Sequence, residues 1–171
     1  MQTAYFKDNF FSRGLTEIFN EKKEKTGYLD LKSALTSSVS VCGLDHRTLI
    51  EGRFSGFFRS RWTVTNQNKE EIGWLKHKLT FTKKVFVYET GNRGSFSIVS
   101  KTFSREYRVF DAQENEIAVF EKVNGFFESS SYKLISRSQI LSIEELTAVV
   151  MGVNMIEKMN NSAAPMGGAV T

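Results

Sequence analysis

Basic side chains gather in one stretch of the sequence, where they could bind an anion. The stretch KHKLTFTKK, positions 76–84, combines four lysines with one histidine and one phenylalanine. In an extended chain Lys76 and Lys78 project to one side, and Lys83 and Lys84 begin the next strand. Phe81 lies among them, and a basic patch with an aromatic side chain suits a peripheral contact with an anionic membrane. The alternative interpretation is a solvated basic loop.

Arg59 and Arg61 form a second candidate group, because Phe57, Phe58 and Trp62 flank them. Guanidinium groups pack on aromatic rings inside a fold without any ligand, and we expect this use here. The same pairing of a cation with an aromatic ring also binds single-stranded nucleic acid in other proteins, but no recognised nucleic-acid module accompanies it here. We therefore keep both arginines as candidates for anion or lipid contact and do not expect nucleic acid as a partner.

Residues that could support catalysis are few. The two histidines, His46 and His77, lie in different segments, and the motifs for nucleophilic, phosphate-binding and zinc chemistry are absent. Cys42 follows an apolar alternation, as a small buried side chain would, and His46 next to Asp45 is typical of a turn. We therefore predict no enzymatic activity, no cofactor and no metal site.

Charge is unevenly distributed along the chain. The net charge is +4, but positions 47–108 contain 13 Lys and Arg against five acids, an excess of +8. Such an asymmetry attracts anionic partners, either a membrane surface or an acidic protein. No apolar run follows Met1, so we expect a cytoplasmic protein without a signal peptide or a transmembrane span, possibly peripheral to a membrane.

The segment 142–159 predicts a helix that is apolar around nearly its whole circumference. It is too short to cross a bilayer, so other protein must cover it. Ser142 and Glu145 have the spacing of a reciprocal capping box, and Asn160–Asn161 predict its end. A narrow polar stripe remains on one side, consisting of Thr147, Asn154 and Lys158. These polar groups either find partners on a strand or line a small opening.

The chain before this helix alternates between polar and apolar residues in short runs, which predicts strands of a sandwich or barrel. The twelve expected strands are 3–7, 15–20, 27–32, 36–42, 46–53, 60–66, 71–76, 83–89, 95–100, 105–111, 116–122 and 131–136.

Twelve strands and one C-terminal apolar helix resemble the tubby C-terminal-like superfamily. The segment EYRVFDAQENEIAVFEKVNGFFESSSYKLI, positions 106–135, looks like a unit of its LURP-one-related and phospholipid scramblase branches. The sequence ELTAVVMGVNMIEKM, positions 145–159, looks like the core helix of that fold. The resemblance implies a mainly β fold, in which a closed antiparallel barrel of about twelve strands encloses the helix.

The resemblance also suggests a function. Tubby proteins bind phosphoinositides and scramblases associate with membranes, so we expect a module that binds anionic phospholipid. The alternative is a protein-interaction or scaffold domain without lipid contact. A carrier of apolar ligands in the lipocalin manner would need an empty lumen. We expect one domain over 1–160 and a flexible tail over 161–171.

Overall fold

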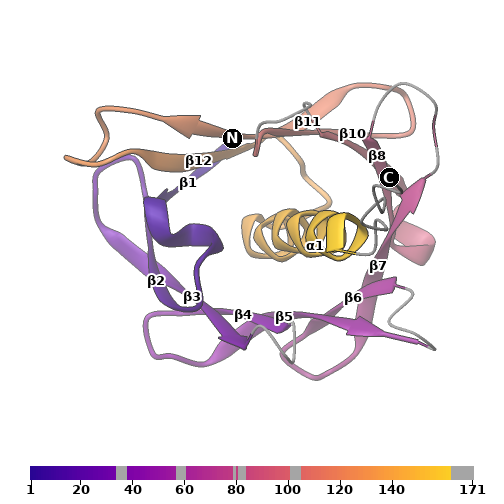
Figure 1. The fold of residues 1–171 in the computed structure, drawn as a ribbon, viewed down its shortest axis with the longest axis horizontal. Helices are drawn as coiled ribbons and strands as arrows, with labels where there is room; N and C mark the ends of the chain where they lie inside the picture. Colours follow the sequence, from indigo (N-terminus) through magenta and orange to yellow (C-terminus); the bar gives the residue numbers. More distant parts are fainter. Residues whose placement is uncertain (34–37, 57–60, 79, 81–83, 101–104, 163–171) are drawn as a thin grey trace, which may run out of the picture.

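A closed antiparallel β-barrel surrounds a single helix (Figure 1). The computed structural model describes residues 1–33, 38–56, 61–78, 80, 84–100 and 105–162. In these ranges the strands are β1 Gln2–Lys7, β2 Gly14–Phe19, β3 Lys25–Ser33, β4 Ser38–Cys42, β5 Thr48–Ser55, β6 Arg61–Asn66, β7 Glu71–Lys78, β8 Lys84–Glu89, β9 Ser95–Ser100, β10 Tyr107–Phe110, β11 Glu116–Val123 and β12 Ser131–Ser136. The helices are the 3₁₀ turns η1 Asp8–Phe11 and η3 Gly91–Arg93, and the α-helix α1 Ile143–Ser162. The predicted fold class is confirmed.

Each strand pairs with its neighbours in sequence, and β1 pairs with β12 to close the barrel. This closing pair is regular from Gln2↔Ser136 to Lys7↔Ser131. The β1–β2 pair is much shorter, with only Tyr5↔Phe19 and Phe6↔Ile18 in register. Closure leaves no free sheet edge among these strands, which removes the usual site of edge-to-edge aggregation.

Similar tight turns join the strands at the end of the barrel where α1 begins. In the turn from Asn20 to Glu24, the first residue's Oδ1 accepts the backbone N–H groups of Lys22 and Glu24 at 2.9 and 3.0 Å. Lys23 has a positive φ of 63°, as a three-residue hairpin loop requires. The turns 66–70 and 111–115 repeat the pattern, with Asn66 and Asp111 as the acceptors. Local turn chemistry thus sets the register of these hairpins.

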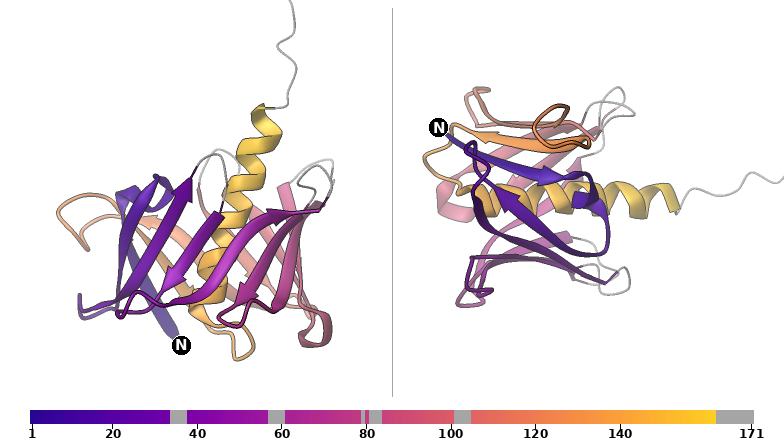
Figure 2. Two further views of the ribbon diagram at one scale, coloured as in Figure 1. Left: turned by 90° about the horizontal axis from the view of Figure 1, so that it is seen from below. Right: turned by 90° about the vertical axis from the view of Figure 1, so that its left-hand side faces the viewer.

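The helix α1 occupies the barrel lumen, as the apolar pattern predicts. Every residue from Glu145 to Ile156 is buried. Ser142 Oγ accepts the N–H of Glu145 at 3.1 Å, which confirms Ser142 as the N-cap. The helix continues to Ser162, past the expected end at Asn160–Asn161. Its last turns extend beyond the barrel (Figure 2), where polar side chains are solvated and need not end a helix. A filled lumen excludes a lipocalin-type carrier.

Aromatic rings fill the lumen on the side of β1, β11 and β12. The turn η1 places Phe10 and Phe11 inside the barrel, and both are buried. The Phe10 ring lies 4.5 Å from that of Phe6 and 5.0 Å from that of Phe120, between centroids. The Phe120 and Tyr132 rings stack at 5.3 Å. Such contacts add about 0.5–1.5 kcal/mol each beyond the area they bury.

On the opposite side, Trp62 fixes how closely α1 approaches the wall. Its indole is fully buried, and Nε1 donates a hydrogen bond to the carbonyl of Ala148 at 3.1 Å. Two glycines make room for the ring: a Cβ at Gly52 would lie 2.7 Å from it, and one at Gly152 only 2.4 Å. The wall and the helix therefore meet across one aromatic ring, with no space for a methyl group on either side.

We expect Gly152→Ala to destabilise the barrel by about 1–3 kcal/mol, because the added methyl group forces Trp62 or the helix to move. Alanine favours helices over glycine, so propensity alone would raise stability. The free energy of unfolding from urea titration measures the difference. Asn160→Ala on the exposed last turn is the control and should change little. A Gly152→Ala protein as stable as the wild type would show that this contact is not tight.

Candidate functional site

Three of the predicted basic residues that the structure describes, Arg61, Lys76 and Lys78, lie on the outer surface of β6 and β7. Lys76 and Lys78 are exposed on β7, and the Lys76 ammonium lies 4.8 Å from the centre of the Trp74 ring. Arg61 approaches the same ring at 5.6 Å. We call Arg61, Trp74, Lys76 and Lys78 the β7 basic strip. Phe81, Lys83 and Arg59 are outside the described residues.

Arg61 packs on an aromatic ring, but on Trp74 at the outer surface and not inside the fold as expected. Trp62 points into the lumen, because successive side chains of a strand face opposite sides. Arg61 also donates to Glu71 at 3.0 Å. Its charge is therefore partly neutralised, which leaves the two lysines as the main cations of the strip.

Lys84 starts β8, and its ammonium lies 3.9 Å from Glu157 of α1. Glu157 also accepts hydrogen bonds from Ser100 at 2.9 Å and Tyr107 at 3.1 Å. Lys84 is thus directed towards the helix and these partners, away from the β7 basic strip. His77 is half-buried, with its ring 5.0 Å from that of Phe86.

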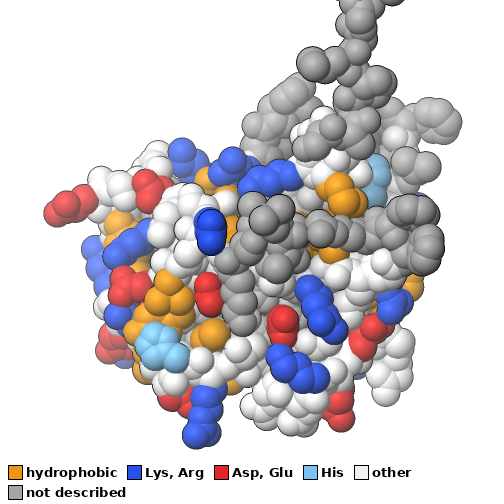
Figure 3. All heavy atoms as spheres, turned by 60° about the horizontal axis from the view of Figure 1, so that its bottom comes forward, with side chains coloured by type: hydrophobic (Ala, Val, Ile, Leu, Met, Phe, Trp, Pro, Cys, Tyr) orange, Lys and Arg blue, Asp and Glu red, His pale blue; other side chains and the backbone are white. Residues whose placement is uncertain are grey.

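A shallow groove of about 730 Å³ runs beside the β7 basic strip. Lys76 and Lys78 form part of its lining, and the acids Glu89, Asp111 and Glu114 form another part. Lysines and carboxylates therefore face the same groove. Over the face shown in Figure 3, basic and acidic side chains are likewise mixed among the coloured residues and form no single block.

A second outer cluster combines aromatic rings with lysines, and the sequence patterns did not reveal it. The loop between β11 and β12 places Phe126 on Tyr5 at 3.5 Å and Phe127 on Phe19 at 5.0 Å, between ring centroids. Lysines cover these rings, namely Lys7, Lys23 and Lys133. Glu17 pairs with Lys7 and with Lys25 at 2.9 and 2.5 Å. The cluster is a satellite core that fixes the loop.

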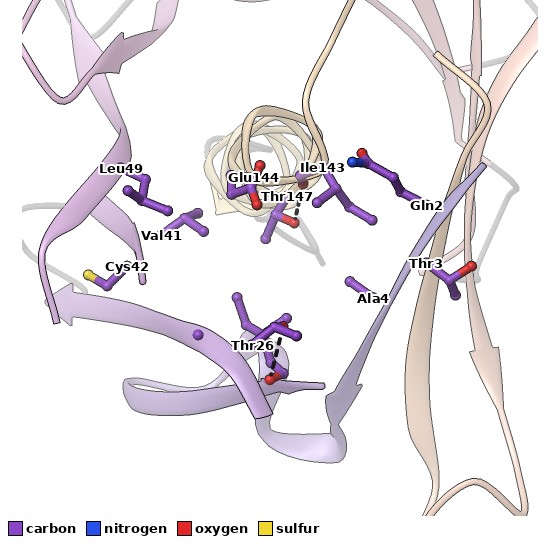
Figure 4. Close-up of a pocket in the computed structure, with 12 residues that line it drawn as sticks. Gln2, Thr3, Ala4, Thr26, Val41, Cys42, Leu49, Ile143, Glu144 and Thr147 are labelled. Carbon is purple, nitrogen blue, oxygen red and sulfur yellow. Dashed lines mark hydrogen bonds between the residues drawn. The ribbon is translucent and has the colours of Figure 1, made fainter. Parts of the chain in front are cut away.

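A pocket of about 270 Å³ lies at the barrel mouth where α1 begins (Figure 4). Its lining comes from β1 to β5 and the first turns of α1. Apolar side chains form much of the wall, and Thr147 of the predicted polar stripe is part of it. The residues are Gln2, Thr3, Ala4, Ile18, Thr26, Gly27, Val41, Cys42, Leu49, Ile143, Glu144 and Thr147.

The three residues of the predicted polar stripe have different surroundings. Thr147 donates to the carbonyl of Ile143 at 2.7 Å, so it is satisfied within the helix. Asn154 is 4% exposed, and its Nδ2 has no hydrogen-bond partner among the described residues. Lys158 is exposed near the end of α1, where partial burial and then the charge of Arg105 lower its pKa. Of the three stripe residues, Thr147 lines the mouth pocket and Lys158 is exposed at the other end of the helix.

Glu145 has other partners than the reciprocal capping box predicted, since only the Ser142 Oγ half of that box forms among the described residues. Its carboxylate is 3% exposed and accepts hydrogen bonds from Tyr88 at 2.6 Å and from Arg93 at 2.8 and 2.9 Å. This pair raises the pKa of the Arg93 guanidinium. Burial, followed by the Glu145 charge, raises the pKa of Tyr88 far above its usual range. The residues are 52 positions apart, so spacing could not reveal the pair.

The remaining candidates have structural roles. Cys42 is buried, and His46 sits in a turn with a φ of 61° and stacks on Tyr28 at 4.3 Å between ring centroids. Within the described ranges, no three His, Cys, Asp or Glu side chains converge as metal ligands. The same ranges contain no helix of sufficient length and apolarity to span a bilayer.

The comparisons with known proteins support the fold alone. No protein-family model matches the chain, and no curated protein matches it. An X-ray structure of a protein from Arabidopsis thaliana, AT5G01750, superimposes with a TM-score of 0.59 at 12% identity, covering 90% of this chain and 91% of that one. The neighbour has a tubby-like fold. The chain therefore shares its architecture with a tubby-like protein.

We expect Tyr88 to weaken the fold at alkaline pH. Burial raises the pKa of Tyr88 in the folded protein, whereas an unfolded tyrosine ionises near pH ~10. The contribution of Tyr88 to the free energy of unfolding is therefore complete below pH ~10, and it decreases above that pH by about 1.4 kcal/mol per pH unit. Urea titrations above pH ~10 should show that the free energy of unfolding decreases less steeply with pH in Tyr88→Phe than in the wild type. Equal slopes would show that Tyr88 does not retain its proton.

We expect Asn154→Leu to leave the free energy of unfolding unchanged or to raise it. The substitution removes a buried donor without a partner and keeps a similar side-chain size. Asn154→Ala is the matched control and should destabilise, because it leaves a cavity. Thermal and urea unfolding measure the free energy of unfolding of both variants. A loss of more than about 1 kcal/mol in Asn154→Leu would mean that the amide is hydrogen-bonded, for example to a buried water.

Proposed function

We propose that this protein is a non-enzymatic binding module that contacts anionic phospholipid surfaces through the β7 basic strip. We also propose membership of the tubby C-terminal-like superfamily, in its LURP-one-related or scramblase-like branch. The helix-filled barrel and the resemblance of positions 106–135 support this membership. A cytoplasmic location, with reversible contact to the membrane, follows from the proposal.

One observation carries the proposal, namely that Lys76 and Lys78 are both exposed on the outer face of β7, with the Lys76 ammonium 4.8 Å from the centre of the Trp74 ring. Neither lysine has a carboxylate within ion-pair distance among the described residues. Tryptophan favours the interface between headgroups and acyl chains, and lysines above it meet anionic headgroups. Each lysine contributes about 1 kcal/mol near an anionic surface, so binding should be weak and sensitive to salt.

A protein partner is the second candidate, and the groove beside the strip favours it. Glu89, Asp111 and Glu114 line this groove together with the lysines, which suits a partner that carries both charges. A membrane rich in anionic lipid would be repelled by that acidic wall. The two candidates therefore use the same lysines but differ in their need for the acids.

Vesicle sedimentation separates these candidates. We expect the protein to bind vesicles that contain phosphatidylserine more than neutral ones, with a marked loss between low and physiological salt. The double variant Lys76→Glu, Lys78→Glu should lose at least tenfold in affinity, because two attractive charges become repulsive.

The matched control reverses two exposed lysines elsewhere, Lys22→Glu with Lys122→Glu, and keeps the net charge equal to that of the test variant. It should bind nearly as well as the wild type. Equal losses in both variants would indicate a general charge effect, and no binding by the wild type would overturn the lipid proposal. In that case, a partner that is lost when Glu89 and Asp111 become Gln and Asn would support the protein-interaction function.

A further inference from the structure

We propose that the barrel-mouth pocket binds a small organic cation, a primary ammonium with a short apolar body. The proposal does not rest on the phospholipid function, because the pocket lies at the start of α1 and shares no residue with the β7 basic strip. It rests on the volume of the pocket, the chemistry of its wall and one carboxylate without a partner.

The pocket is a consequence of how α1 sits in the barrel. The helix packs mainly against β4, β5, β6 and β7. On the side of β1 the lumen wall carries the small residue Ala4, which leaves space beside the first turns of the helix. Gly27 of β3 also lines the pocket, although a Cβ there would meet the Cys42 carbonyl oxygen. Strands and a helix therefore build the pocket, which favours a fixed shape.

The volume of the pocket limits the size of the ligand. About 270 Å³ corresponds to roughly nine water-sized volumes of ~30 Å³, and thus to a molecule of about nine non-hydrogen atoms. Ile18, Val41 and Ile143 supply apolar contacts for its body. A cluster of water molecules would find few partners on these side chains, so an apolar body suits this part of the wall.

Three polar side chains of the wall, Thr26, Thr147 and Glu144, offer acceptors to a ligand, and Gln2 and Thr3 add polar groups that can also donate. The Thr147 hydroxyl donates to Ile143 O at 2.7 Å, and the Thr26 hydroxyl donates to Ile18 O at 3.4 Å. Each hydroxyl proton is thus used, and only the oxygen lone pairs remain for a ligand. The Glu144 carboxylate accepts only. A ligand that donates hydrogen bonds, as an ammonium group does, complements these three acceptors.

Glu144 supplies the charge. It is the only ionisable Asp, Glu, Lys, Arg or His among the residues that line the pocket. It has no ion pair or hydrogen bond with any described residue, whereas the adjacent Glu145 is fully engaged by Arg93 and Tyr88. Figure 4 shows Glu144 and Thr147 side by side on α1, facing the space bounded by Val41 and Thr26. An acid in the first turn also offsets the helix dipole, but this leaves its oxygens free to accept a ligand.

Calorimetric titration with phenethylammonium chloride tests the proposal, because this probe has about the right size. We expect saturable binding with a dissociation constant of about 1 mM or lower. Phenethyl alcohol, which is neutral and similar in shape, should bind at least tenfold more weakly. Glu144→Gln should remove that preference, because it should weaken binding of the amine at least tenfold. Glu128→Gln, in an exposed loop, should not change the affinity for either probe.

Two further variants test the location. Ala4→Leu fills the pocket and should abolish binding of both probes. If it fails to fold, Leu49→Trp narrows the mouth from a side chain that is 37% exposed and serves the same purpose. The proposal is overturned if neither probe binds, if both bind equally, or if amine binding survives Glu144→Gln or blockage of the pocket in a folded variant. Vesicle binding is measured separately, so failure here leaves the phospholipid proposal intact.

Discussion

The structure depends on one constraint, which is that a barrel of this size must be filled. The helix α1 meets this need because its side chains from Glu145 to Ile156 are buried on all sides. Close approach to the wall then requires glycine at the two points where Trp62 is inserted. The aromatic rings of η1 and β11 fill the lumen on the other side. Hydrophobic burial thus sets the position of the helix, and the remaining features adapt to it.

Burying a helix brings polar groups into the lumen, and the two carboxylates near its ends find hydrogen-bond partners there. At the start of α1, Glu145 is bonded to Tyr88 and Arg93. Near its end, Glu157 is bonded to Ser100 and Tyr107. A buried ion pair contributes little net stability, but removal of one partner leaves an uncompensated charge. The two groups therefore specify the depth and rotation of the helix more than they stabilise it.

Local patterns in the sequence predicted the strands and the helix, because alternation and capping act over a few residues. Contacts between distant segments could not be predicted in this way. Arg93 lies in the turn η3, and only the closed barrel brings it to Glu145. Trp62 and Trp74 both lie in alternating strands, yet one is fully buried beside α1 and the other lies on the outer face beside Lys76. The end of α1 was predicted too early, because polar residues can extend a helix that leaves the barrel.

The same alternation separates the requirements of folding from those of binding. On β7, Leu75 faces the lumen while Trp74 and Lys76 face outwards, so a charge on the surface can change without altering the packing inside. The mouth pocket is not separated in this way. Ala4 and Thr147 line it and also belong to the buried interior, so the space for a ligand depends on how α1 is packed. Substitutions that shift the helix should therefore alter the pocket and leave the β7 basic strip in place.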